Sequence, residues 1–582
     1  MTTTRSGFTK LAAVCIAILL GAVVWELGWP LTRAEHEWSR LIAAVATLGH
    51  LTGILGSYFR KEINRPSLRL LIFQIISCLM IFLLIAREQQ EAGYMRFTEL
   101  SRLVITAGLI AIPTLMSLTR IFEWLVGKQK KGRPLMAPAM QFVASLGVVI
   151  LAGTGLLLLP NSTYPGITLS FTDALFTSTS AVCVTGLNAV DFAHTFTPLG
   201  EMFTLALIQI GGFGIMTFAY FVAMVAGQGF SLRDRVLLTD LLDEDNLGAV
   251  VSFITTIVVS TLFIELCGAV LLYFSWEGKD INLMGEPLWW HSLFHAVSAF
   301  CNAGFSTFPM NLMEPGIRLC YSGQAVIMAL IVCGGLGFGI YKEINSRLAN
   351  RFFSKHRRLH MQWTPYFKLV MISTGILLAG GALAIFAVSS PHAAEPLGEH
   401  LWICLFDSVT ARTAGFNISD YSRYLPAASL IMCGLMMVGG SPGGTAGGMR
   451  TTTCAIAGAE ILRILRGRDH VEFFRRRIDQ RTVARCVITV VVSCAWIGCF
   501  TVLICALEPS MSSLDIFFEN CSAFATVGVS RGITPDLSDP SKYLLIVNML
   551  AGRVGLFAFL IALAGTPTPR HYRYPSVKIP LT

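Results

Sequence analysis

Four short runs that each end in a glycine recur along this chain at nearly constant spacing. They are STSAVCVTG (178–186), AVSAFCNAG (296–304), SVTARTAG (408–415) and NCSAFATVG (520–528). Their closing glycines, Gly186, Gly304, Gly415 and Gly528, lie 118, 111 and 113 residues apart. A fourfold internal repeat in a hydrophobic chain predicts four similar units arranged around one axis, with a pore at the centre.

The composition places this repeat in a membrane. Of the 582 residues, 54% are hydrophobic and 14% are charged, and the mean hydropathy is +0.64. Apolar stretches of about 20 residues recur, the length needed to cross a bilayer. The first, Leu11 to Trp29, lacks a small-residue cleavage site, so we interpret it as a retained transmembrane helix rather than a signal peptide. We therefore expect an all-α polytopic membrane protein and not a soluble enzyme.

The positive charge is better explained by topology than by nucleic-acid binding. The formal net charge is +9, and basic clusters lie at 128–133, 347–358 and 463–477, each between two hydrophobic spans. The connections between these clusters carry few basic residues, which is the pattern of the positive-inside rule. This alternation predicts a cytoplasmic N-terminus. The 15 cysteines are scattered through apolar runs and are typical of small buried hydrophobes.

The chain divides into an N-terminal region and four units. Residues 1–134 predict four transmembrane helices, at about 10–29, 41–59, 68–87 and 101–127. The pore units are predicted at 135–240, 241–350, 351–470 and 471–582, the third with a gate loop within the membrane and the fourth with the C-terminal tail. Each unit begins with a long apolar helix, at 141–160, 250–274, 367–388 and 484–507. Each ends with a second long helix, at 199–226, 321–341, 425–461 (interrupted) and 542–564.

Between the long helices of each unit lies a shorter segment that ends at the repeated glycine. These segments, at 171–181, 291–300, 401–411 and 514–524, are too short to span a bilayer. Non-helical backbone at membrane depth is tolerated where it is buried in protein or lines a watery cavity. The segments therefore predict four re-entrant half-helices beside a pore.

The residues at the repeated glycines suit a cation filter made of backbone carbonyls. Such carbonyls can replace the hydration shell of an ion, and the negative ends of the half-helices would attract a cation. A ring of acidic side chains is missing, which favours a monovalent cation. Arg412 lies within the third run, and we expect it to point away and pair with a carboxylate of Asp407, Glu519 or Asp173. The predicted filter residues are Val184, Thr185, Gly186, Asn302, Ala303, Gly304, Thr413, Ala414, Gly415, Thr526, Val527 and Gly528.

The run GGSPGGTAGG (439–448) interrupts the third unit in mid-membrane. Six glycines and a proline within ten residues prevent a continuous helix. The run is either a rigid helix break that shapes the cavity or a mobile loop that obstructs conduction beneath the filter. Its candidate gate residues are Gly439, Gly440, Ser441, Gly443, Gly444, Thr445, Gly447 and Gly448.

Several long motifs resemble the Trk/Ktr/HKT superfamily of potassium transporters, and most closely its KtrB-type (TrkH-like) membrane subunits. The resemblance covers about 138–575 and includes the four filter runs. It also includes LIQIGGFGIMT (207–217), GGSPGGTAGGMRTTT (439–453), RGRDHVEFFRRRI (466–478), AGRVG (551–555) and YRYP (572–575). The four helices expected before residue 135 depart from the family pattern.

The resemblance implies a fold and a function. The family fold has four membrane–pore-loop–membrane repeats around one pore, with an intramembrane gate at the segment that matches 439–448. Arg553 matches an arginine near that gate, and glycine at position 186 goes with potassium rather than sodium as the transported ion. The family also implies a bacterial inner membrane location, a homodimer and a separate cytosolic nucleotide-binding ring of the RCK type. No cofactor is implied in this chain, and its surroundings are the lipid bilayer rather than nucleic acid.

Two other classes of function compete with a potassium-conducting subunit. A sodium- or proton-coupled secondary transporter of the alternating-access type also uses broken helices, but usually two of them in inverted halves. A membrane enzyme would draw on His291, His295 and His360 with Asp407 and Glu519. His291 and His295 share one helix face at a spacing that can hold a metal, although packing of that helix is the simpler explanation.

Overall fold

The computed structural model describes residues 138–214, 250–353, 363–389, 396–557 and 559–560, together with scattered positions between 14 and 52. The helices expected at 68–87 and 101–127 lie outside the described residues, and those at 10–29 and 41–59 are described only in part. His360 and the motif at 572–575 also lie outside them.

Four short helices lie at the positions that the sequence predicts. They are α6 (Phe171–Cys183), α12 (Leu288–Cys301), α17 (Leu397–Thr410) and α21 (Ser513–Ala525). The longer helices before them are α5 (Pro138–Leu157), α11 (Val250–Trp276), α16 (Pro365–Val388) and α20 (Gln480–Leu507). The helices after them are α8 (Pro198–Phe213), α14 (Tyr321–Gly335), α18 (Pro426–Met437) and α22 (Asp539–Val554).

The remaining elements are shorter or lie at the ends of the helices. They are α7 (Phe192–Thr195), α13 (Pro315–Arg318), α15 (Phe338–Phe353), α19 (Thr451–Leu465), the 3-10 turns η1 (Pro160–Ser162), η2 (Asn311–Met313) and η3 (Tyr421–Arg423), and a hairpin of β1 (Glu472–Phe473) with β2 (Arg476–Arg477). In the hairpin, Glu472 faces Arg477 and Phe473 faces Arg476 in antiparallel register.

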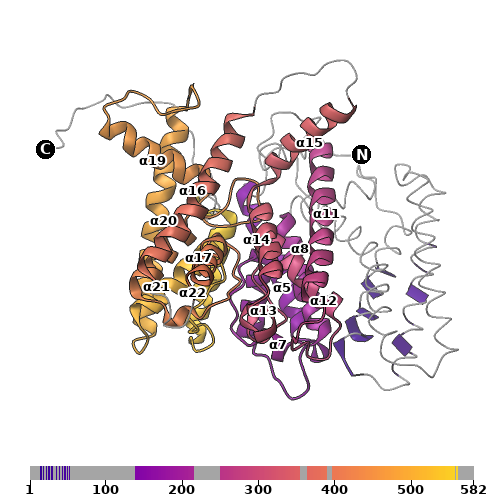
Figure 1. Ribbon diagram of the computed structural model, residues 1–582. Coiled ribbons are helices and arrows are strands. Elements are labelled where there is room, and N and C mark those ends of the chain that lie inside the picture. The colour runs from indigo at the N-terminus through magenta and orange to yellow at the C-terminus, as the bar shows by residue number, and fades with distance from the viewer. Residues whose placement is uncertain are drawn as a thin grey trace, which may run out of the picture.

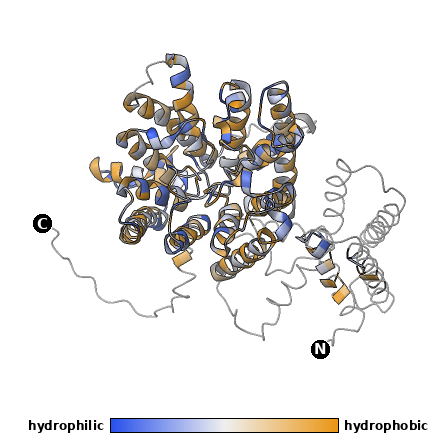
Figure 2. Cartoon of the chain, turned by 90° about the horizontal axis from the view of Figure 1, so that it is seen from below, coloured by the Kyte–Doolittle hydropathy of each residue, from blue (hydrophilic) through white to orange (hydrophobic). Residues whose placement is uncertain are grey.

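The helices pack in a closed order. Each short helix contacts the long helix before it and the helix after it. The helix after each short helix also contacts the next short helix: α8 contacts α12, α14 contacts α17, α18 contacts α21, and α22 contacts α6. This last pair joins the C-terminal part of the described chain to its beginning, so the helices surround one centre, as the views along and across them show (Figures 1 and 2).

Three described helices are long and apolar enough to cross a membrane: α20, α16 and residues 254–276 of α11. The pair α14 and α15 passes the same test together, but it is bent by 95°. The outer faces of these helices carry exposed apolar side chains, such as Phe263 (66% exposed) on α11 and Val502 (69% exposed) on α20. Apolar surface of this kind is stable against lipid and costly in water.

The second long helices end earlier than the sequence analysis expected, although residues 215–226 of the first lie outside the described residues. The helix expected at 321–341 ends at Gly335 and restarts as α15 at a sharp angle. Similarly, α8 ends before Gly214 and α22 before Gly555, and Gly214, Gly337 and Gly555 have φ of +77°, +89° and +90°. Glycine adopts this backbone region without the steric penalty that a Cβ imposes, which explains breaks that hydropathy could not reveal.

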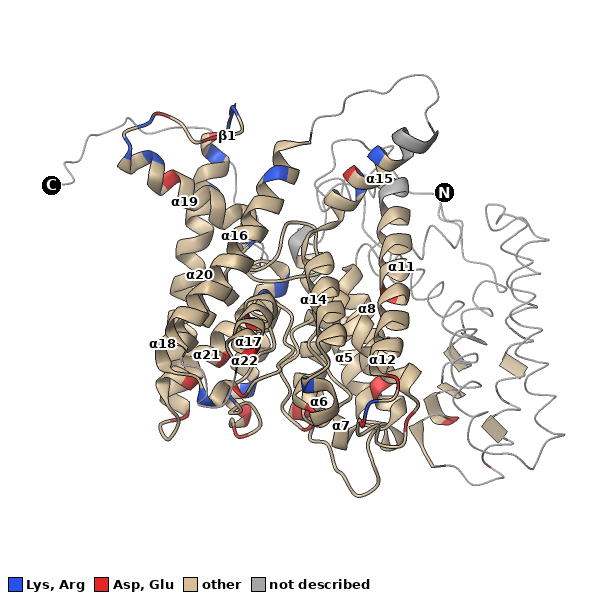
Figure 3. Cartoon of the chain, viewed as in Figure 1, with Lys and Arg blue, Asp and Glu red and all other residues tan. Residues whose placement is uncertain are grey.

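Charged residues separate to the two ends of the helices. Lys and Arg gather around α15, α19 and the β1–β2 hairpin, at the top of Figure 3. Acidic residues are more frequent among the loops at the opposite end (Figure 3). The end that carries α15 and α19 therefore matches the basic side expected from the sequence.

Candidate functional site

The four short helices end in the same backbone turn. The residue two places before each closing glycine is left-handed, with φ of 57° at Val184, 61° at Asn302, 74° at Thr413 and 52° at Thr526. The closing glycines also have positive φ: +90° at Gly186, +71° at Gly304, +81° at Gly415 and +93° at Gly528. The predicted filter residues thus form four copies of one tight turn, and all of them are buried.

The four closing glycines meet in a ring. A Cβ built on Gly186 would lie 3.0 Å from the Cα of Gly304, and one on Gly304 would lie 2.7 Å from the Cα of Gly415. A Cβ on Gly415 would lie 3.3 Å from the Cα of Gly528, and one on Gly528 would lie 2.9 Å from the Cα of Gly186. The backbones converge so closely that a side chain at any of these positions would collide with the next turn.

A hydroxyl near the end of each short helix braces the turn. In the first and fourth turns it accepts a hydrogen bond from the glycine N–H, and in the other two it donates to the carbonyl after the glycine. The bonds are Gly186 N to Ser180 Oγ (3.0 Å), Gly528 N to Ser522 Oγ (3.1 Å), Ser298 Oγ to Phe305 O (2.8 Å) and Thr410 Oγ1 to Phe416 O (2.6 Å). Sequence reasoning missed these hydroxyls, although their place five or six residues before the glycine was visible.

A second set of glycines lets the following helices touch the short ones. A Cβ on Gly334 would collide with the carbonyl oxygen of Phe300, and one on Gly552 with that of Phe524. A Cβ on Gly211 would meet the carbonyl of Val182 in the same way. These glycines therefore permit a close approach between the helices.

The 439–448 loop joins α18 to α19 and lies against the break between α14 and α15. Three backbone bonds connect them: Ser441 N to Gly335 O (2.9 Å), Thr445 N to Gly334 O (3.2 Å) and Phe338 N to Gly443 O (3.0 Å). Val438 and Met449 form a bridge that closes the base of the loop. The loop is thus held by the backbone of a helix more than 90 residues earlier in the chain.

The same loop reaches the ends of two short helices. The hydroxyl of Thr445 donates to the carbonyl of Phe300 (3.2 Å), near the end of α12. A Cβ on Gly447 would collide with the side chain of Thr526, and one on Gly448 would lie 3.2 Å from the Cα of Ala525. The loop therefore lies directly beside the second and fourth turns.

Two side chains from other helices bind the loop backbone. Arg553 of α22 donates through Nη1 to the carbonyl of Thr445 and through Nη2 to the carbonyl of Gly211. The phenol of Tyr366, on α16, donates to the carbonyl of Pro442 (2.9 Å). Arg553 was a sequence candidate, whereas Tyr366 was not, because a single tyrosine near a helix start gives no sequence signal of a contact 76 residues away.

Arg412 does not pair with a carboxylate as expected. Its Nη2 donates to the carbonyl of Gly439 (3.2 Å), and its Nε and Nη1 have no hydrogen-bond partner among the described residues. Asp407 instead accepts from Tyr421 (2.9 Å) and Tyr424. The sequence analysis was wrong here because it matched charges along the chain, whereas the carboxylates are satisfied by loop hydroxyls.

The other two carboxylates proposed for Arg412 also have their own partners. Glu519 accepts from the hydroxyls of Ser530 and Thr534 and from the backbone N–H of Arg531 (3.1 Å). Asp173 forms an ion pair with Lys542 (2.8 Å). These groups hold loops and helices together and lie apart from the guanidinium.

The histidines of α12 take part in ordinary hydrogen bonds. Nδ1 of His291 lies 2.6 Å from the hydroxyl of Thr307, and Nε2 of His295 lies 2.8 Å from the hydroxyl of Ser306. In the part of the chain that the structure describes, no group of three His, Cys, Asp or Glu residues could hold a metal ion. The structure thus favours packing of α12 as the role of these histidines, because each has a neighbouring hydroxyl as its hydrogen-bond partner.

A buried carboxyl group in the loop before α12 has a raised pKa. Glu286 precedes α12, and burial raises its pKa above the usual range, while a hydrogen bond with Glu201 acts in the opposite direction. The indole of Trp290 donates to Glu201 (2.7 Å). The loop therefore carries a carboxyl group that keeps its proton to a higher pH than a free glutamate does.

Comparison with known proteins gives the site a family context. Residues 105–574 match the TrkH family model, described as "Cation transport protein". The "Ktr system potassium uptake protein B" of Bacillus subtilis is 34% identical over 446 residues, which cover 74% of this chain and 94% of that protein. The "Potassium/sodium uptake protein NtpJ" of Enterococcus hirae is 32% identical over 466 residues, covering 78% and 99%.

A solved structure has a similar fold. The potassium transporter TrkH from Vibrio parahaemolyticus superposes with a TM-score of 0.58, covering 85% of this chain and 97% of that one. The sequence identity is 18%, so this likeness concerns the fold alone.

Proposed function

This chain belongs to the TrkH family of cation transport proteins, and from that premise we propose that it carries potassium into the cell through a channel-like pore. The family membership predicted from the motifs is confirmed. The relatives are named as potassium uptake proteins, which agrees with the prediction that the chain is not an enzyme.

The ring of four glycine turns is the observation that carries this proposal. In each turn the residue before the glycine has its carbonyl close to the neighbouring glycine, for example Ala414 O, 2.8 Å from a Cβ built on Gly304. Carbonyls gathered in this way can replace the hydration shell of a monovalent cation. In this proposal the selectivity filter consists of the residues at 184–186, 302–304, 413–415 and 526–528.

The packing order supports four tandem repeats around the pore. In this proposal the repeats are residues 135–240, 241–350, 351–470 and 471–582, and residues 1–134 form a separate N-terminal membrane region. Each repeat contributes one long helix, one short pore helix and one broken helix. The contact of α22 with α6 closes the circle.

The 439–448 loop is the proposed gate. It lies beside two of the turns and is held by bonds from α14, α16 and α22. In this proposal Arg553 keeps the loop in the obstructing position, because a guanidinium bound to two carbonyls ties α8, α22 and the loop together. Displacing the loop would open the path below the filter.

The surroundings of the subunit follow from its family. We place it in the inner membrane of a bacterium, as a homodimer, with the α15, α19 and hairpin side facing the cytosol. A separate nucleotide-binding ring of the RCK type would bind this basic side. The basic residues there support the orientation through the positive-inside rule.

Potassium-dependent growth of an uptake-deficient strain tests the proposal. Expression of the chain, with and without a candidate cytosolic partner, should restore growth at low potassium, and rubidium should compete better than sodium. Growth that stays at the level of the empty vector under both conditions would contradict the proposal. Unitary currents in a planar bilayer would exclude the alternating-access alternative, which cannot reach channel rates.

A further inference from the structure

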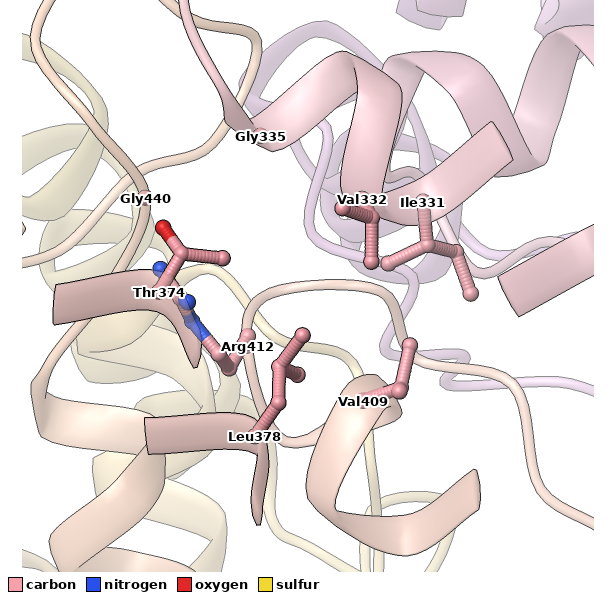
Figure 4. Close-up of a pocket in the computed structure, with 8 residues that line it drawn as sticks. All are labelled: Ile331, Val332, Gly335, Thr374, Leu378, Val409, Arg412 and Gly440. Carbon is pink, nitrogen blue, oxygen red and sulfur yellow. The ribbon is translucent and has the colours of Figure 1, made fainter. Parts of the chain in front are cut away.

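A small cavity lies behind the third turn, between α14, α16 and α17 (Figure 4). Its walls are mainly apolar, from Ile331, Val332, Leu378 and Val409. The space open to the centre of a water molecule is about 20 Å³, and about 10–15 Å³ is enough for one small occupant. The cavity therefore has room for a single atom or ion of roughly water size.

Two polar side chains that line this cavity carry hydrogen-bond donors without an acceptor among the described residues. Arg412 is 7% exposed, and its Nε and Nη1 have no partner among the described residues. Thr374 is 8% exposed, and its hydroxyl also has none. In Figure 4 the hydroxyl of Thr374 and the guanidinium of Arg412 lie at the same side of the cavity.

The hydroxyl of Thr374 is one of several buried helical threonine hydroxyls without a partner among the described residues, with those of Thr177, Thr179 and Thr261, and the one that lines this cavity. Thr154, Thr204 and Thr489 each donate to the carbonyl four residues earlier, at 2.8, 2.9 and 2.8 Å. Thr374 is helical too, yet it does not make this bond. Its donor remains free for an occupant of the cavity.

The charge decides what kind of occupant fits. A buried guanidinium without a carboxylate is costly in a low-dielectric interior, and a water molecule supplies an acceptor but no compensating charge. We propose that the cavity binds one small monovalent anion of the halide class, such as chloride, held by Nε and Nη1 of Arg412 and the hydroxyl of Thr374. This binding does not depend on the proposed function.

The site is linked to the 439–448 loop. The third nitrogen of the same guanidinium, Nη2, donates to the carbonyl of Gly439, and Gly440 lines the cavity. An anion at the site fixes the guanidinium and with it the first residue of the loop. It also offsets a positive charge that lies only three residues from Gly415 of the ring.

Bromide provides a direct probe of the site. Crystals of the full chain grown in potassium bromide should show an anomalous peak within hydrogen-bond distance of Arg412 Nε, and crystals in potassium gluconate should not. The absence of a bromide peak, with only an ordered water between Arg412 and Thr374, would overturn the proposal. Transport plays no part in this measurement, so its failure would leave the potassium proposal intact.

Thermal stability in detergent gives the second test. At constant potassium and ionic strength, chloride should raise the Tm relative to gluconate in a saturable way. Thr374→Val removes one donor to the anion and should raise the half-effective chloride concentration about tenfold, whereas Thr374→Ser should keep it near the unsubstituted value. Thr489→Val is the control. It makes the same change at a threonine whose hydroxyl already donates to the carbonyl of Arg485, and it should leave the chloride response unchanged.

An identical Tm in chloride and gluconate, or an equal chloride response in the Thr374→Val and unsubstituted proteins, would contradict the site. Arg412→Gln should abolish both the chloride response and the bromide peak. That variant removes a buried loop contact and can fail to fold. The comparison of Thr374→Val with Thr374→Ser therefore decides whether the anion site exists.

Discussion

The four glycine turns and the 439–448 loop are both rich in glycine, but the loop depends on bonds from distant helices that the turns do not need. Each turn is braced by its own short helix, through a hydroxyl five or six residues before the glycine. The loop has bonds to its own flanks, such as Gly439 N to Met449 O and Thr451 N to Gly440 O. It is bound in addition by distant elements: the α14–α15 break, Tyr366 and Arg553.

This difference indicates which part is fixed and which can move. A turn whose bonds are local keeps its shape whenever its helix is formed. A loop whose bonds come from several helices loses its position when those helices shift relative to one another. Local bracing suits the proposed filter, and dispersed bracing suits the proposed gate.

The largest effect is expected in the ring. Gly528→Ala places a Cβ against the backbone of the first turn and demands φ of +93° from alanine. We expect a loss of at least about 2–3 kcal/mol of stability and no rubidium uptake by the reconstituted protein. Gly434→Ala, in an open position on α18, is the control and should change the stability by about 1 kcal/mol or less. Full rubidium uptake by the Gly528→Ala variant would contradict the assignment of the four turns as a fixed filter.

The next effect concerns the distant bracing of the loop. Arg553→Gln weakens two bonds from a charged donor to the carbonyls of Thr445 and Gly211. Since such bonds contribute about 1.5–3 kcal/mol, basal rubidium uptake into liposomes should rise about tenfold or more. Arg481→Gln, at an exposed position on α20, should leave uptake unchanged. Unaltered rubidium uptake in the Arg553→Gln variant would contradict the proposal that the 439–448 loop is a gate.

A smaller change of the same sign is expected at Tyr366. Tyr366→Phe removes the hydrogen bond to Pro442 O and should increase basal uptake about three- to fivefold, the effect of about 1 kcal/mol. Tyr543→Phe removes a hydroxyl contact with Thr172, away from the loop, and should have no such effect. A decrease in uptake would show that Tyr366 stabilises the open arrangement instead.

The smallest effect is a pH dependence of the stability, which arises from a carboxyl group in the loop before α12. Because burial raises the pKa of Glu286 above that of a free glutamate, the folded protein binds more protons than the unfolded chain at mildly acidic pH. Stability should therefore fall as pH rises from about 5 to 8, by roughly 2–4 °C in Tm. Because Glu286 shares a hydrogen bond with Glu201 and the two carboxyl groups titrate together, Glu286→Gln should reduce this slope without removing it. An undiminished slope in that variant would show that Glu286 takes no part in the titration.

The sequence predicted the local part of this architecture and missed much of the rest. The positions of α6, α12, α17 and α21 followed from apolar runs that end at a glycine, because helix, turn and brace all lie within about ten residues. The end of α8 at Phe213 and the breaks after α14 and α22 were missed, since hydropathy continues across Gly214, Gly337 and Gly555 without interruption.

Long-range partners were the hardest to predict. Arg412 was expected to find a carboxylate, yet it binds the carbonyl of Gly439, and Tyr366 gave no sign of its contact with Pro442. A charge or a phenol can bind any exposed carbonyl, so the residue type alone does not identify the partner. Arg553 was anticipated only through the family motif.

Anomalous diffraction from rubidium or thallium tests the central claim most directly. With either ion in place of potassium, we predict a peak on the axis enclosed by Gly186, Gly304, Gly415 and Gly528, at coordination distance from the carbonyls of the four turns. A ring without a peak, together with ordered ions in another cavity of the protein, would contradict a filter made by these turns.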